Sequence, residues 1–241
     1  MTPISEIGMA VPLTFTEDRL TTFDRDQRAK LLQQGFTMGM IHQLQLRNND
    51  TLLHIWILDN SASMNQADGY KMIGSTGVKD MNPLKCTRWE DIVNTAFYHA
   101  ELATLIKAPT IFRLLNACPD IASEYAIASM PYISKESLDQ DLMRFKQWLE
   151  AVHPTGRTPL THQIYEICQI VQSMDQTIRM NGQHVVLCIT TDGLPSDERG
   201  VCDDEQCELF RKSLRKLERL PIEIIFRLST DHRVVKKVSL T

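Results

Sequence analysis

Side chains with oxygen donors follow two apolar segments of this chain. Asp59-Asn60-Ser61-Ala62-Ser63 comes directly after the apolar segment 52–58, and Asp192-Gly193 comes after the apolar segment 184–191. Between them, Thr158 adds a hydroxyl just before a predicted helix. Carboxylates and hydroxyls are the ligands that a hard cation prefers, and Mg2+ commonly keeps water or partner oxygens at positions that the protein leaves empty. The residue types therefore indicate a Mg2+ (or Mn2+) site with an open position.

Each of these residues also has an ordinary structural explanation. Asp, Asn and Ser are common in turns because they form local hydrogen bonds. Thr158 before Pro159 is typical of a helix N-cap followed by the first helical residue. A cation site is favoured over these explanations because all three segments are predicted to lie at the sheet edge that binds ligands in open α/β folds.

The elements that must position these residues are predicted from hydrophobic periodicity. From residue 51 onward, short apolar segments alternate with longer amphipathic ones, which is typical of a doubly wound α/β fold with a mostly parallel sheet and helices on both faces. The predicted strands are 52–58, 110–115, 125–128, 184–191 and 222–229. The predicted helices carry apolar faces over 89–103, 138–152, 160–178 and 205–220. A capping box of Ser137 and Gln140 is expected to open the second of these helices.

Residues 1–50 are predicted to be an N-terminal extension with one helix, and residues 51–241 to be the main domain. Asp24 is expected to cap that helix, and Gly35 and Gly39 to weaken it. The helix is predicted from apolar residues at helical spacing, namely Ala29, Leu32, Phe36, Met40 and Leu44.

The segment 66–87 is interpreted as a long loop beside the cation site, and either a role in partner choice or a mobile insertion fits it.

Composition narrows the class of protein. The net charge is −4, so no global basic field attracts the chain to nucleic acid or an anionic membrane. A basic cluster on the predicted helix 205–220 is explained by a solvated face, and nucleic acid is not expected as a partner.

No segment approaches the roughly 18 apolar residues of a membrane span, and we expect a soluble, cytoplasmic protein. The six scattered cysteines are expected to be free thiols.

The pattern Asp59-x-Ser61-x-Ser63, with the distant Thr158 and Asp192, resembles the metal-ion-dependent adhesion site of the von Willebrand factor type A (VWFA) family. The resemblance covers residues 52–230. It implies a Rossmann-like sheet in which Asp59, Ser61, Ser63, Thr158 and Asp192 coordinate the metal, directly or through water. It further implies a protein-binding module, not an enzyme, whose metal accepts an Asp or Glu side chain from a partner protein.

Two further expectations concern alternatives and the C-terminus. Asp59 would also suit a metal-dependent hydrolase that forms an aspartyl-phosphate, although Ser61 stands where phosphatases of that kind place a second carboxylate. Residues 231–241 are too short for the closing helix and strand that the resembled family adds, so the C-terminal end is expected to be truncated. The exposed sheet edge would then be able to support self-association.

Overall fold

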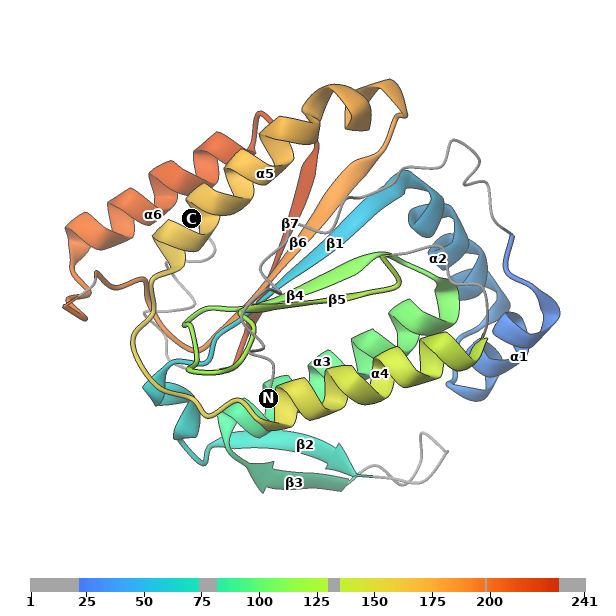
Figure 1. The fold of residues 1–241 in the computed structure, drawn as a ribbon, viewed down its shortest axis with the longest axis horizontal. Coiled ribbons are helices and arrows are strands. Elements are labelled where there is room, and N and C mark those ends of the chain that lie inside the picture. Colours follow the sequence, from blue (N-terminus) through green and yellow to red (C-terminus); the bar gives the residue numbers. More distant parts are fainter. Residues whose placement is uncertain (1–21, 74–81, 130–134, 198, 230–241) are drawn as a thin grey trace, which may run out of the picture.

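The computed structural model describes residues 22–73, 82–129, 135–197 and 199–229, and these form a doubly wound α/β unit around a five-stranded sheet (Figure 1). The strand order is β5-β4-β1-β6-β7. Strands β4, β1, β6 and β7 are parallel, and β5 pairs antiparallel with β4. The strand bounds are Thr51–Leu58 for β1, Thr110–Leu114 for β4, Glu124–Ile127 for β5, His184–Thr191 for β6 and Ile222–Leu228 for β7. The predicted mostly parallel sheet is confirmed.

The chain leaves β1 toward β4 on one side and later returns to β6 on the other side of β1. Strands β1 and β6 therefore flank the point at which the strand order reverses. In open α/β sheets the connections at such a point run to opposite faces and leave a crevice at the carboxyl ends of the strands. Asp59 and Asp192 are the first residues after these two strands, so the topology brings them to the same edge of the sheet.

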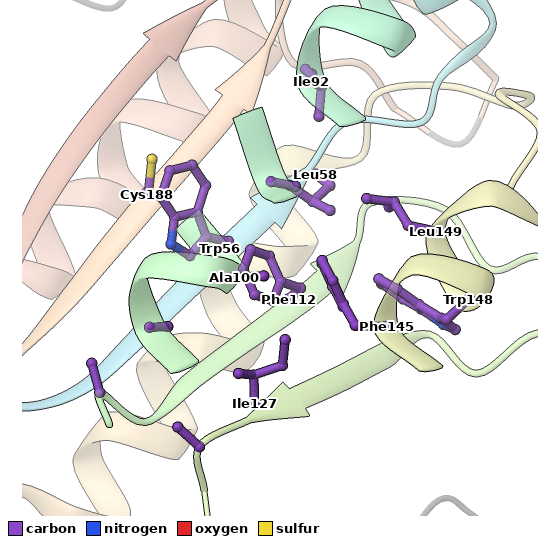
Figure 2. Packing of buried hydrophobic residues seen from close by; sticks show 14 of the residues in the cluster. Trp56, Leu58, Ile92, Ala100, Phe112, Ile127, Phe145, Trp148, Leu149 and Cys188 are labelled. Atoms are coloured by element: carbon purple, nitrogen blue, oxygen red, sulfur yellow. The ribbon is translucent and has the colours of Figure 1, made fainter. Parts of the chain in front are cut away.

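Helices cover both faces of the sheet because successive residues of the central strands point alternately to opposite faces. One face carries Trp56, Leu58 and Phe112 and packs against α3 (Arg88–Ile106) and α4 (Lys135–Glu150), as Figure 2 shows. The other face packs against α5 (Leu160–Met180) and α6 (Asp204–Leu217), which lie together on the opposite side of the sheet in Figure 1. The central strands are thereby packed between helices on both faces.

The predicted single N-terminal helix is wrong: the structure has two helices, α1 (Arg25–Gln33) and α2 (Met38–Asp50). The break comes at Gly35, whose φ of 90° lies in the left-handed region that glycine adopts readily. Asp24 forms the expected cap of α1 through a capping box with Gln27. Leu31 and Ile41 are buried in the same cluster as Trp56, so the described part of the extension packs onto the core of the main domain.

Three other local expectations are corrected. The segment 66–87 is not simply an irregular loop. It follows the short helix η1 (Ala62–Asn65) and contains two strands that pair antiparallel, β2 (Gly69–Ile73) and β3 (Asn82–Cys86). Ser137 lies within α4 instead of capping it. Thr158 is not the N-cap of α5, since Pro159 occupies that position without a side-chain cap bond. The Thr158 hydroxyl is thus not engaged in capping α5.

The structure also bears on the cysteines, on membrane-spanning helices and on the edge of the sheet. All six cysteines are free thiols, as predicted. None of the helices in the described ranges combines the length and the apolar character that a membrane crossing needs. Within those ranges β7 is an edge strand of the sheet. The predicted truncation concerns residues 231–241, which lie outside the described residues, and self-association through this edge stays a prediction.

Two partly buried histidines lie on the α3 side of the sheet, in the wall of a cavity of about 590 Å³. Burial lowers the pKa of both His54 and His99 to about 4. The ring of His99 packs 4.4 Å from that of Trp56, measured between centroids. His54 Nδ1 is buried and has no hydrogen-bond partner among the described residues. Burial therefore favours the neutral form of both rings down to a pH of about 4.

We predict that the free energy of unfolding falls as the pH is lowered from about 6.5 toward 4, because His54 and His99 bind protons there only in the unfolded chain. Asp59, whose pKa burial raises to about 6, acts in the opposite direction, but it is one group against two. Each ring should contribute on the order of 1 kcal/mol between pH 7 and pH 5. Urea unfolding at several pH values measures this slope. His99→Gln should flatten it, whereas His153→Gln, at an exposed position, should not. A slope that is equal in wild type and both variants would contradict the prediction.

Candidate functional site

Asp59 lies directly beyond β1 and is fully buried. Its Oδ1 accepts a hydrogen bond from the Ser61 backbone N–H at 2.9 Å, and its Oδ2 accepts one from the Thr191 hydroxyl at 2.5 Å. Burial nevertheless raises the pKa of Asp59 to about 6, with a smaller upward contribution from Asp192, against the lowering effect of these hydrogen bonds. The carboxylate is therefore oriented by its partners but lacks full charge compensation.

Ser61, Ser63 and Asp192 form a connected set of oxygens. The two serine hydroxyl oxygens are 3.1 Å apart, and the Ser63 hydroxyl donates to Asp192 Oδ1 at 2.8 Å. The short helix η1 turns the chain just after β1 and places both hydroxyls beside the end of β6. Residues 129 positions apart in sequence thus meet because β1 and β6 are neighbours in the sheet.

The loops around this set are tied together by Asn60. Its amide oxygen accepts from the Asn116 backbone N–H at 2.7 Å, its amide nitrogen donates to the Asn116 carbonyl at 3.0 Å, and its own carbonyl accepts from Thr155 N–H at 2.8 Å. Asn116 in turn donates from its side chain to the Arg157 carbonyl at 2.7 Å. The loops that follow β1, β4 and α4 are thereby joined.

Thr158 is brought to the site by this loop and by two hydrogen bonds with Ser196. Ser196 N–H donates to the Thr158 carbonyl at 3.0 Å, and Thr158 N–H donates to the Ser196 hydroxyl at 3.1 Å. The Thr158 hydroxyl oxygen lies 3.6 Å from where a Cβ on Gly193 would stand. Thr158 is therefore buried directly beside the Asp192-Gly193 turn. The structure brings all five predicted residues together at the carboxyl ends of β1 and β6.

Arg88, which the sequence reasoning missed, also belongs to this site. Its Nη1 lies 2.6 Å from Asp192 Oδ2, while Nε and Nη2 donate to the two carboxylate oxygens of Asp68, each at 2.6 Å. Only 10% of the Arg88 side chain is exposed, against 0% of that of Asp192 and 57% of that of Asp68. The guanidinium therefore bridges a buried carboxylate and a surface one. The contacts with Asp68 and Asp192 raise the pKa of Arg88, and the hydrogen bonds from the guanidinium lower the pKa of Asp68.

The approach of β2 to the start of α3 makes this bridge possible. Thr87 and Glu90 form a capping box that begins α3, so Arg88 is its first residue. A Cβ on Gly69 would lie 2.8 Å from the Thr87 carbonyl oxygen, closer than carbon and oxygen atoms pack. Glycine thus allows the hairpin to pack against this helix end and bring Asp68 to Arg88. No sequence pattern signals this, because the contact joins a turn and a helix that meet only in the fold.

The described residues contain no group of three or more His, Cys, Asp or Glu side chains that could hold a metal. A cation at this edge would therefore depend on the hydroxyls of Ser61, Ser63 and Thr158 as well as on the two carboxylates. Compared with models of known protein families, the chain matches none, and no curated protein sequence matches it either. The function must accordingly be argued from the site itself.

We predict that the Thr191 hydroxyl stabilises the fold mainly through the Asp59 charge. Thr191→Val should cost about 1–3 kcal/mol of unfolding free energy in wild type, because a buried carboxylate loses a donor. The same substitution should cost less in an Asp59→Asn background. Urea unfolding in chelator buffer measures this cycle.

Thr190→Val is the matched control, since the Thr190 hydroxyl is also buried but donates to the neutral Ile57 carbonyl at 2.8 Å. Its cost should be the same in both backgrounds. An equal cost of Thr191→Val with and without the Asp59 charge would show that the hydroxyl contributes only as an ordinary neutral hydrogen bond.

Proposed function

We propose that this protein is a metal-dependent protein-binding module, similar to VWFA domains, that binds Mg2+ (or Mn2+) through Asp59, Ser61, Ser63, Thr158 and Asp192. The observation that carries the proposal is the chain of hydrogen bonds from Ser61 through Ser63 to Asp192, beside buried Asp59. Buried carboxylates without full compensation are costly, and a bound cation would remove that cost.

The donor set fits a hard cation in type. All donors are oxygens, as Mg2+ prefers, and two of them are carboxylates. Asp59 has both oxygens engaged by Ser61 N–H and Thr191, which suits contact through water better than direct coordination. Asp192 directs one oxygen toward Ser63 and the other toward Arg88, so Oδ1 is the oxygen that faces the hydroxyls. A metal held here would supply a Lewis-acidic centre with a coordination position for an external oxygen.

A carboxylate is the ligand that such a centre favours. Three of the five donors are neutral hydroxyls, and they leave the charge of a divalent cation less compensated than a cage of carboxylates would. An Asp or Glu side chain of a partner protein carries the opposite charge and an oxygen ligand together. The proposed partner is therefore a protein that presents an acidic residue to this sheet edge.

Catalysis by Asp59 is the alternative, but no observation of the site favours it. An aspartyl nucleophile needs a free, accessible oxygen in line with the substrate. Asp59 is completely buried, and each of its oxygens accepts a hydrogen bond. Turnover of p-nitrophenyl phosphate by wild type, lost in Asp59→Asn, would favour the hydrolase over the binding module.

The first test of the proposal is the thermal stability with and without metal. We predict that Mg2+ raises the melting temperature by roughly 5–10 °C when its concentration is a hundred times the Kd, because only the folded site binds it. Asp59→Ala and Asp192→Ala should abolish this shift. Asp139→Ala, which removes an exposed carboxylate of α4, should keep it. Equal shifts in all four proteins would contradict the metal site.

The second test concerns the proposed carboxylate ligand. An array of peptides with a single central Asp should include members that bind the protein in Mg2+ and release it in EDTA, while the same peptides with Asn should not bind. Thr158→Ala should weaken the binding about tenfold or more without unfolding the domain. Thr155→Ala, at an exposed position of the same loop, is the control. Binding that is indifferent to chelator would contradict this mechanism.

A further inference from the structure

Arg88 stands where a helix does not favour a cation. It is the first residue of α3, and the N-terminus of a helix carries the positive end of the helix dipole, which disfavours a positive side chain. The guanidinium is nevertheless almost buried and uses Nε, Nη1 and Nη2 to contact carboxylates. Its position is therefore explained by the negative charge of Asp192 and Asp68 and not by the helix.

The charges of Asp59, Asp192 and Arg88 show what Arg88 contributes to the site. Asp59 and Asp192 together carry two negative charges in a buried environment, and Arg88 supplies one positive charge in direct contact with Asp192. The three groups sum to −1, whereas the two carboxylates alone sum to −2. A divalent cation would bring the site to +1 with Arg88 present and to 0 without it.

We propose that Arg88 is the internal counter-cation of this site, which weakens its affinity for a divalent cation and strengthens the attraction of the loaded site for a carboxylate. The inference rests on the proposed function, because it assumes that the cation binds beside Asp192. Arg88 is a positioning and charge-setting residue that acts through Asp192 Oδ2, while Asp192 Oδ1 faces the serine hydroxyls.

Asp68 completes the arrangement. It binds two nitrogens of the guanidinium, so it holds Arg88 in place and offsets part of its charge. Its side chain is 57% exposed and belongs to the turn before β2, which allows its substitution without opening the core. Asp68 thus links the β2–β3 hairpin to the charge of the site.

The proposal predicts effects of opposite sign for two ligands. Titration calorimetry of the full chain with Mg2+ should show that Arg88→Gln binds the metal about tenfold tighter than wild type, since a unit positive charge near the cation is removed. The Mg2+-loaded variant should bind acetate more weakly than loaded wild type. Its melting temperature in EDTA should fall, because the buried Asp192 loses its partner.

Two further variants make the test decisive. Arg157→Gln removes one positive charge from an exposed residue next to Thr158 and should change Mg2+ affinity less than about twofold. Asp68→Asn retains Arg88 but removes the surface charge that offsets it, so it should bind Mg2+ a few-fold more weakly. If Arg88→Gln does not fold, Arg88→Met in the Asp68→Asn background takes its place. It should bind Mg2+ more tightly than Asp68→Asn alone, because this comparison isolates the charge of Arg88 from that of Asp68.

The outcomes separate this inference from the proposed function. Tighter metal binding together with weaker acetate binding in Arg88→Gln supports the inference. Unchanged or weaker metal binding in that variant, with wild type binding Mg2+, overturns the inference and leaves the metal site standing. A merely structural Arg88 would give this second pattern with a lowered melting temperature. Absence of Mg2+ binding in every variant, Arg88→Gln included, overturns both.

Discussion

The burial of two carboxylates side by side, at the ends of β1 and β6, is the constraint on which this structure depends. Asp59 and Asp192 are both almost inaccessible to solvent, and such charges are costly in a protein interior unless they are compensated. The Thr191 hydroxyl, the Ser61 backbone N–H, the Ser63 hydroxyl and the Arg88 guanidinium all direct donors at these two groups. The surrounding loops are arranged to provide them.

The rest of the fold makes this compensation rigid. The two apolar layers fix β1 and β6 relative to each other, and their paired register sets the distance between the residues that follow them. Asn60 and Asn116 then join three loops by hydrogen bonds to backbone groups. A cluster of hydroxyls and carboxylates is thus held in position by the fold itself, which would reduce the ordering cost of the proposed metal binding.

The hairpin and the start of α3 change the character of the site. Without Arg88 both buried carboxylates would lack a cationic partner, whereas with it Asp192 has one. The contact depends on Gly69, since a side chain there would collide with the backbone at Thr87. A segment whose length suggests an irregular loop therefore serves to bring Asp68 to Arg88 and to cover the helix end.

The order and type of most elements could be predicted from the sequence. So could the meeting of Asp59, Ser61, Ser63, Thr158 and Asp192 at one edge of the sheet, whereas their role as metal ligands stays a prediction. Hydrophobic periodicity is local, so the central strands, the helices over 160–178 and 205–220 and the buried face of α4 could be read directly. The parallel pattern further implied that residues after β1 and β6 would meet at one edge. The folded structure was needed to find the break at Gly35, the hairpin within 66–87, and the contacts of Thr191, Asn60, Asp68 and Arg88. These depend on contacts between residues far apart in the chain, such as Arg88 with Asp192 across 104 positions. The energy of such contacts comes from burial and neighbouring charge, which exist only once the chain has folded.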